Sequence, residues 1–507
     1  MRAAVAAACG VYAASYLRLM RHFWAEEDDA QFVLAAGDWL WRGAPAGRLW
    51  GFRHGMGDFW LSVPFLAAFG PGDAALQWRN GTFGLLGIYA CGLLSFELGA
   101  GLFGSAAAAL LLALTPGWVI LSERGITSSM AGCVFAALSL ALWLRAARTG
   151  RPWLSAPAAL LLGAALWTNS TKAIWALELA AAGCVGALSS PWAGLPPKKK
   201  RALMAACLVL FLLPQAPAVL GIFNPYFFEF WTKVAHWRNN FRPGLLASGL
   251  AKRLAQSADL LDARRLRAIP LAALGGTIAV LAARSGRLTR RDALPWIIIA
   301  LYIPLSLLSP GDLYIAHLLV LLPLFWAGVC ALAAKPARPA SRALAAAALA
   351  GLLCWRAVSF AQMLRNEGPY RDGALPARAL FAYFENRAEL RPVFVGEAPF
   401  FGTLFYSRGR IVPLRIDGGP EDSANSPSSH QFDDRPPERI DPEAQWNAAF
   451  SAPNARFVIL SRGRTSSMKG DFLTRLARRG LTARREAVIP GPGGDPAYDI
   501  YRLEPPL

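Results

Sequence analysis

The sequence predicts a polytopic α-helical membrane protein of about eleven transmembrane helices, followed by a soluble α/β domain at the C-terminus. Of the 507 residues, 55% are hydrophobic and only 17% are charged. Long apolar segments recur through residues 1–362, and a more polar composition replaces them in residues 363–507. This composition is unsuited to one soluble domain and typical of a membrane protein with a soluble appendage.

Eleven apolar segments are long enough to cross a bilayer core of ~30 Å. A shorter apolar stretch at residues 57–70 is interrupted by Pro64, and we interpret it as an interfacial or re-entrant piece. The eleven candidate spans cover residues 3–20, 74–98, 101–121, 127–145, 154–170, 172–190, 202–222, 267–283, 293–309, 313–334 and 343–362.

The distribution of basic residues predicts the orientation of the chain. The formal net charge is +19, and four of the five loops on one side of the predicted membrane domain carry basic clusters. Because positively charged loops stay in the cytoplasm, we expect a cytoplasmic N-terminus and a periplasmic C-terminal domain in the bacterial inner membrane. The periplasmic side then receives a first loop at residues 21–73 and a long loop at residues 223–266. The basic clusters fall at residues 145–153, 191–201, 284–292 and 335–342.

The same charge bears on the partners of the protein. In a soluble protein a charge of +19 would suggest nucleic acid. Here the basic residues lie largely in short loops between apolar segments, so they suit membrane orientation and the phosphates of anionic lipids. We therefore expect membrane lipids, and no nucleic acid, as partners.

The C-terminal region alternates between helical and strand patterns, which predicts a small α/β domain. Residues 416–444 are rich in Pro, Ser, Asp and Gly, and they predict a flexible surface loop. The expected strands are residues 393–396, 410–413, 457–460, 484–489 and 498–502, and the expected helices are residues 375–388 and 468–479.

The first loop opens with four consecutive carboxylates, Glu26, Glu27, Asp28 and Asp29. The Trp and Leu residues that follow suit a helix lying in the membrane interface. A carboxylate there can be a general base toward a hydroxyl or phosphate acceptor, or can hold a divalent cation through oxygen ligands. Alternatively, the acidic run only favours the N-terminal end of a helix and keeps the loop soluble.

The spacing of this segment resembles the GT-C superfamily of polyprenyl-phosphate-dependent glycosyltransferases. The chain looks most like the branch that holds the bacterial protein O-mannosyltransferases and the lipid A aminoarabinose transferases. In that family the first outside loop opens with an Asp-Glu pair whose Asp is linked to catalysis. The resemblance assigns Asp28 to the Asp position and Asp29 to the Glu position, although the register Glu27-Asp28 also fits. The pattern consists of Asp28-Asp29, Phe32, Ala36, Leu40 and Gly43.

Further segments are similar to the family in the order in which they occur. ALQWRNGTFGLL at 75–86 is similar to the Arg-containing start of the second span, which places Arg79 at the outer face. Two segments depart from the family. The usual Asp in the turn before the fourth span is missing from residues 125–130. Arg53 and His54 stand where the aminoarabinose branch has an acid and a Lys, so a metal ligand is missing there. The other similar segments are residues 103–116 with 122–124, 163–172, 312–328 and 393–414.

A lipid-phosphate donor leaves a phosphate oxygen that needs fixed positive charge. Candidates from separate span ends are Arg79, Arg124 and Lys172, and the first loop adds Arg53 and His54. Alternatively, any one of these side chains only reaches for water at the membrane boundary. A divalent metal ion is the cofactor that the carboxylates allow, with Asp28 and His236 of the long loop as ligands, although a lone His is more often a surface residue.

With this resemblance, the sequence predicts a membrane glycosyltransferase that acts at the periplasmic face. It would take a hexosyl or pentosyl group from a polyprenyl-phosphate donor. The acceptor would be an envelope lipid, glycan or protein. The alternative is a non-enzymatic membrane transporter or envelope-assembly scaffold. A transporter should place ionisable residues near the middle of several spans, whereas most charges here fall at span ends.

Overall fold

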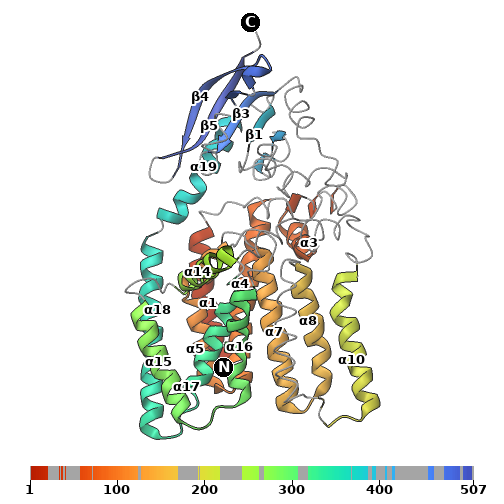
Figure 1. The fold of residues 1–507 in the computed structure, drawn as a ribbon, viewed down its shortest axis with the longest axis vertical. Coiled ribbons are helices and arrows are strands. Elements are labelled where there is room, and N and C mark those ends of the chain that lie inside the picture. The colour runs from red at the N-terminus through yellow and green to blue at the C-terminus, as the bar shows by residue number, and fades with distance from the viewer. Residues whose placement is uncertain are drawn as a thin grey trace.

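The computed structural model shows a bundle of helices capped at one end by a five-stranded sheet (Figure 1). The structure describes residues 2–20, 33–34, 36–37, 40–41, 57–70, 72–123, 127–168, 192, 194–216, 243–261, 268–305, 318–366, 368–385, 391–395, 406–407, 414–416, 455–461, 473–474, 476–491 and 495–504.

The helices of the bundle follow the predicted apolar segments closely. Two short 3-10 turns, η1 (Pro152–Leu154) and η4 (Leu213–Gln215), adjoin them. The helices are α1 (Arg2–Met20), α3 (Gly57–Phe69), α4 (Asp73–Glu97), α5 (Gly101–Ala113), α6 (Pro116–Glu123), α7 (Thr127–Thr149), α8 (Ser155–Thr168), α10 (Pro197–Leu212), α14 (Pro243–Leu260), α15 (Ala268–Arg284), α16 (Arg290–Leu305), α17 (Leu321–Ala333) and α18 (Pro339–Arg365).

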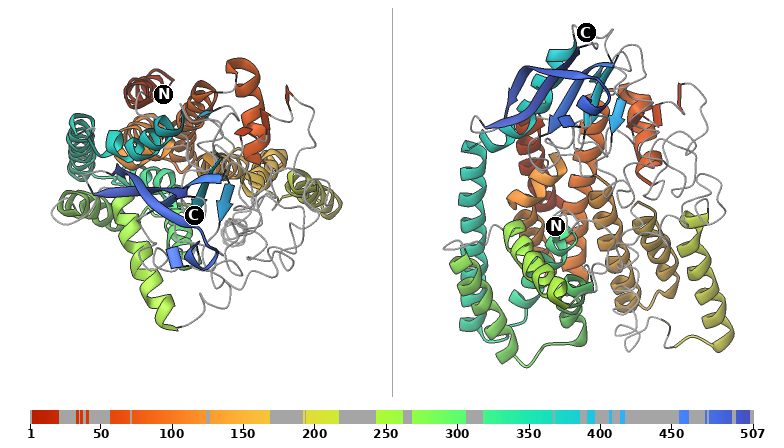
Figure 2. Two further views of the ribbon diagram at one scale, coloured as in Figure 1. Left: turned by 90° about the horizontal axis from the view of Figure 1, so that it is seen from above. Right: turned by 45° about the horizontal axis from the view of Figure 1, so that its top comes forward.

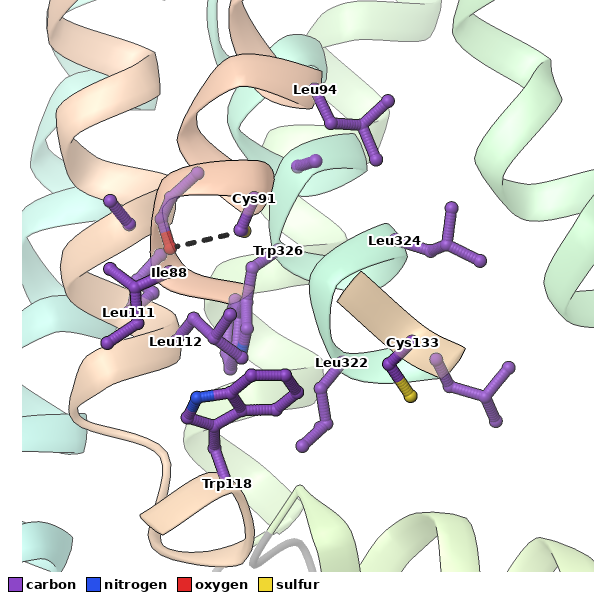
Figure 3. Packing of buried hydrophobic residues seen from close by; sticks show 14 of the residues in the cluster. Ile88, Cys91, Leu94, Leu111, Leu112, Trp118, Cys133, Leu322, Leu324 and Trp326 are labelled. Carbon is purple, nitrogen blue, oxygen red and sulfur yellow. Dashed lines mark hydrogen bonds between the residues drawn. The ribbon is translucent and has the colours of Figure 1, made fainter. Parts of the chain in front are cut away.

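Two large aromatic side chains fill the centre of the bundle beside glycines of α4. A Cβ atom on Gly84 would lie 1.8 Å from the Tyr12 hydroxyl, and one on Gly87 would lie 2.1 Å from the Trp118 ring. The Trp118 indole donates a hydrogen bond to the Gly84 carbonyl over 3.2 Å. Figure 3 shows Trp118 below Trp326 of α17 in this core. The glycines therefore let α1 and α6 approach α4 closely.

The outer surface of the bundle is apolar. Phe103 is 93% exposed, Val209 62% and Ile269 59%, although each belongs to a helix of the bundle. Two described helices are long and apolar enough to cross a membrane, at Met130–Thr149 and Pro339–Arg365, and six shorter apolar helices accompany them. Exposed apolar side chains on a bundle suit contact with lipid. The number of eleven spans stays a prediction, and the candidate span at residues 172–190 lies outside the described residues.

The two ends of the bundle differ. The loops that join α7 to α8, α15 to α16 and α17 to α18 lie at the end remote from the sheet (Figure 1). We call this the basic end, because these loops carry predicted basic clusters, and we call the other the sheet end. Two ion pairs hold the basic end. The Arg148 guanidinium contacts the Glu97 carboxylate at 2.8 and 3.1 Å, and the Lys335 ammonium lies 2.6 Å from the Asp292 carboxylate.

One predicted span is divided in the structure, and the predicted long connection contains a helix. The span expected at residues 101–121 is divided into α5 and α6, because Pro116 lacks an amide hydrogen and disfavours a helical conformation at Thr115. The long loop expected at residues 223–266 contains helix α14. Seen from the sheet end, α14 is drawn along its length while α8 and α10 are seen nearly end-on (Figure 2), so it lies across the bundle axis.

The C-terminal sheet is mixed and has the strand order β2-β1-β3-β5-β4. Strand β1 pairs in parallel with β2 and β3, while β5 pairs antiparallel with β3 and β4. Helix α19 (Gly368–Glu385) packs against β4 and β5. The division into domains after residue 362 stays a prediction, and most of the loop at residues 416–444 lies outside the described part of the chain. The strands are β1 (Arg391–Val395), β2 (Leu414–Ile416), β3 (Ala455–Ser461), β4 (Thr482–Pro490) and β5 (Pro496–Glu504).

Candidate functional site

Arg79 is a buried guanidinium at the sheet end of the bundle. It lies in the second turn of α4 and is 1% exposed. Its Nη1 donates a hydrogen bond to the Ser62 hydroxyl of α3, and its Nε donates one to the Asn80 side-chain oxygen over 3.2 Å. A buried arginine requires hydrogen-bond partners. Ser62 and Asn80 carry no charge, so they orient the guanidinium without neutralising it themselves.

The start of α4 is fixed to the end of α1. The Tyr16 hydroxyl donates to the Gln77 carbonyl over 2.8 Å, and the Gln77 amide donates to the Met20 carbonyl over 3.1 Å. Met20 is the last residue of α1, and Asp28 follows it by eight residues. The end of α1, from which the chain continues to the acidic segment, therefore lies within one helical turn of Arg79 along α4. Because eight extended residues span at most about 28 Å, Asp28 lies no farther than that from Met20.

Two further chain ends meet beside α3. A Cβ atom on Gly57, the first residue of α3, would lie 2.7 Å from the Cα atom of Thr168, the last residue of α8. His54 precedes Gly57 by three residues, and Lys172 follows Thr168 by four. The backbones of Gly57 and Thr168 are thus in contact at this end. His54 and Lys172 are each only a few residues from this contact along the chain.

The same end holds the turn between α6 and α7. Arg124 falls between Glu123 and Thr127, where these two helices end and begin. Both helices pack against α4, and α7 also packs against α3. Four chain segments that carry predicted site residues therefore start or finish around the helix of Arg79.

Among the predicted site residues, only Arg79 belongs to the described part of the chain. The others lie outside it, so their arrangement stays a prediction. Within the described residues, no group of three or more His, Cys, Asp or Glu side chains gathers to hold a metal ion. Since both proposed ligands are among the residues outside that part, a metal site also stays a prediction. These residues are Asp28, Asp29, Arg53, His54, Arg124, Lys172 and His236.

Two buried arginines were not predicted as site residues. Arg356 of α18 is 0% exposed and donates a hydrogen bond to the Leu261 carbonyl. Its guanidinium carbon lies 4.0 Å from the centroid of the Trp355 ring and 5.3 Å from that of the Trp326 ring. Leu261 directly follows α14, so Arg356 attaches α14 to the bundle. The sequence signal was an arginine inside the predicted span 343–362, which is a functional or structural position by default.

Arg253 is the second of these arginines. It is 0% exposed on α14, and its Nη1 donates to the Gln256 side-chain oxygen over 3.2 Å. Burial lowers the pKa of Arg253, while the nearby Tyr302 raises it. By contrast, Leu254 on the same helix is 52% exposed. Helix α14 therefore turns a charge toward the bundle and a leucine outward, as a helix in the membrane interface does.

The fold is similar to that of solved structures of ArnT from Cupriavidus metallidurans. The crystal structure bound to undecaprenyl phosphate matches with a TM-score of 0.66 and 16% identity, covering 98% of this chain and 97% of that chain. The apo structure matches with a TM-score of 0.64 and 15% identity over the same shares. No family model matches the sequence, and neither does any curated protein. At these identities the likeness concerns the fold, and it extends over nearly the whole of both chains. The chain therefore shares the fold of these ArnT structures, which is the fold that the sequence resemblance predicted.

Proposed function

We propose that the protein is a membrane glycosyltransferase that transfers a sugar from a polyprenyl-phosphate donor to an envelope acceptor. Reaction would take place at the sheet end of the bundle, which the basic loops at the other end would orient toward the periplasm. The donor class follows from ArnT, whose crystal structure holds undecaprenyl phosphate. The transferred sugar is a hexosyl or pentosyl group, mannosyl or aminoarabinosyl among the family's choices, and the acceptor is an envelope lipid, glycan or protein.

One observation carries the proposal. Arg79 is buried at the sheet end, on the helix around which the segments with predicted acidic and basic residues begin or end. A guanidinium presents several donors in a rigid fork and matches phosphate oxygens. Its position beside the Ser62 hydroxyl and the Asn80 amide holds this fork in a fixed direction.

The proposed reaction is a direct displacement. Asp28, with Asp29 beside it, accepts the proton of the acceptor hydroxyl. The acceptor oxygen forms a bond to the anomeric carbon of the sugar while the bond from that carbon to the phosphate oxygen breaks, which inverts the configuration. The leaving polyprenyl phosphate gains negative charge. Arg79, Arg124 and Lys172, with Arg53 and His54 of the first loop, stabilise that charge. A divalent ion held by Asp28 and His236 would supply further positive charge.

The described charges favour an enzyme over the alternative of a transporter. The buried charged side chains in the described part of the predicted spans are Arg79, Glu97 and Arg356. Arg79 and Glu97 lie within about two turns of an end of α4, and Arg356 is occupied by the Leu261 carbonyl that attaches α14. Transport through the bundle would instead require such groups near the membrane midplane.

The test is transfer of radiolabelled sugar from polyprenyl-phosphate donors by the purified chain in lipid nanodiscs. Wild type should form labelled product, and Asp28→Asn should reduce the rate by at least about 100-fold, since general-base catalysis contributes 10²–10⁴-fold. Asp495→Asn is the matched control, because it neutralises an exposed carboxylate just before β5 that has no part in the proposed reaction, and it should retain the wild-type rate. Equal rates for Asp28→Asn and Asp495→Asn would remove Asp28 from the mechanism, and no transfer from any polyprenyl-phosphate donor would contradict the proposed function.

A further inference from the structure

A polar contact joins the first turn of the Arg79 helix to the C-terminal domain. Asp73 is the first residue of α4, and it precedes the predicted span at residues 74–98. The Tyr406 hydroxyl donates a hydrogen bond to the Asp73 carboxylate, and the positive charge of Arg378 on α19 attracts it. The Oδ1 atom of Asp73 is buried and has no hydrogen-bond partner within the described part of the chain. Asp73 is thus held by two side chains that are about 300 residues away in sequence.

The partners of Asp73 are themselves fixed by the C-terminal domain. Arg378 and Phe381 are three residues apart on α19, so they share one face of the helix. The Phe381 ring lies 6.1 Å from the Tyr406 ring, measured between centroids. On the neighbouring face, Leu380 and Phe384 are 0% exposed. The face of α19 that meets Asp73 is therefore packed within the domain and is not a mobile surface.

Helix α19 is also connected to the sheet. The Tyr383 hydroxyl donates to the Glu486 carboxylate of β4 over 2.7 Å. Figure 1 shows α19 between the bundle and the sheet. A continuous set of contacts thus runs from β4 through α19 and Tyr406 to Asp73, which is six residues before Arg79 on the same helix.

We propose that Asp73, Tyr406 and Arg378 form a docking contact that holds the C-terminal domain over the Arg79 end of the bundle and so positions it for acceptor binding. Asp73 is a positioning residue in this role, since it touches no reacting atom. Docking itself does not depend on the proposed glycosyl transfer. Only the effect on acceptor binding rests on the proposed function.

The docking contact is tested by distance measurement on the full chain in nanodiscs. Spin labels are placed at Ala68 of α3 and Arg485 of β4, both exposed, in a chain whose native cysteines are replaced. Wild type should give one narrow distance distribution. Asp73→Ala and Tyr406→Phe should each broaden it and raise the undocked population about tenfold, because a hydrogen bond to a charged group is lost. Asp495→Ala is the matched control, since it removes an exposed carboxylate of the same domain outside this set of contacts, and it should leave the distribution narrow.

A charge exchange separates docking from folding. Arg378→Glu should broaden the distribution, since two carboxylates would then face each other, and Asp73→Lys combined with Arg378→Glu should narrow it again. If Asp73→Ala and Tyr406→Phe both match wild type while all variants unfold at the wild-type temperature, the docking contact is wrong.

The activity readout depends on the proposed function and is read separately. Loss of docking should raise the KM for the acceptor several-fold and leave the KM for the lipid donor within twofold of wild type. A broadened distribution in a chain that transfers no sugar would retain the docking contact and reject the glycosyltransferase. A broadened distribution with both KM values unchanged would reject the role in acceptor binding.

Discussion

The two ends of the bundle hold their buried charges in different ways. At the basic end, the Glu97 carboxylate is 1% exposed and receives both donors of the Arg148 fork. At the sheet end, the Arg79 guanidinium is oriented by the Ser62 hydroxyl and the Asn80 amide. A bidentate pair of opposite charges satisfies both partners and fixes two helices. Ser62 and Asn80 fix the direction of the Arg79 fork, and the ion pair of Glu97 with Arg148 joins α4 to α7. The basic end thus has a pair that holds two helices together, whereas the sheet end has a guanidinium held in one direction, as the proposed binding of phosphate requires.

The largest expected effect comes from the same substitution, Arg to Lys, made at each end of the bundle. Arg79→Lys should lower the rate of sugar transfer by about 100-fold, because the loss of one preorganised donor to developing charge costs 10²–10³-fold and a lysine cannot reproduce the fork. Arg148→Lys should keep the rate within about twofold, since its ion pair with Glu97 lies at the other end. Initial rates are measured at equal amounts of folded protein. Equal losses for the two variants would show that Arg79 also has only a structural role.

The free energy of unfolding should depend more on Arg148, at the basic end, than the rate of sugar transfer does. Arg148→Ala leaves the buried Glu97 carboxylate without its guanidinium, and breaking such a pair costs about 3–5 kcal/mol. Because Arg148 itself is 43% exposed, water can partly replace it. We therefore expect the free energy of unfolding to fall by about 3 kcal/mol, at the lower end of that range. Unfolding of the purified chain by denaturant in detergent measures this loss. Glu97→Gln combined with Arg148→Gln removes both charges and should recover most of the stability. No recovery in the double variant would show that the loss came from packing rather than from the unpaired carboxylate.

The middle of α4, between the two ends, depends on shape rather than charge. Gly84→Ala would place a methyl group 1.8 Å from the Tyr12 hydroxyl, and overpacking of this kind costs about 1–3 kcal/mol. Gly275→Ala on α15 is the control, because no atom lies within 4 Å of its added methyl group. It should be neutral or stabilising by about 0.5–1 kcal/mol through helix propensity. Thermal unfolding of both variants gives the comparison, and equal transition temperatures would contradict close packing at Gly84.

The sequence predicted the bundle well because apolar length is a direct physical signal. The spans expected at residues 3–20 and 74–98 correspond to Arg2–Met20 and Asp73–Glu97. The signal failed where composition stays apolar but the backbone changes, as at Thr115 before Pro116. Helix α14 lies within the long connection predicted at residues 223–266, but its mixed composition did not show where the helix begins and ends. Its role depends on Arg356, which is 95 residues from Leu261 in sequence.

The candidate site was less accessible to sequence reasoning than the fold. Arg79 was named through a family resemblance, and the structure adds that its side chain is buried, while its role stays a prediction. Arg253 and Arg356 were missed, because an isolated arginine in a sequence does not reveal whether it faces water or the protein. Asp73 was missed for the same reason, since Tyr406 and Arg378 approach it only after the C-terminal domain has folded. Contacts between distant segments are the part that composition and periodicity do not encode.

The smallest expected effect concerns the pH dependence of docking at the sheet end. Burial raises the pKa of Asp73 above its ordinary value, while the hydrogen bond from Tyr406 and the charge of Arg378 lower it by less. The two effects that come from the C-terminal domain, the hydrogen bond from Tyr406 and the charge of Arg378, both favour the ionised carboxylate in the docked state. Docking should therefore weaken as the pH falls and Asp73 gains its proton, and it should strengthen above that range.

A contact dominated by the burial of Asp73 would behave in the reverse way, because a neutral acid is buried at a lower cost than a carboxylate. The docked population from the spin-label distances, compared between roughly pH 7 and pH 4, distinguishes the two cases. Asp73→Asn keeps an oxygen that can accept from Tyr406 but cannot titrate, so its docked population should not vary with pH. A docked population that rises with decreasing pH in wild type would mean that burial, rather than Tyr406 and Arg378, dominates the contact.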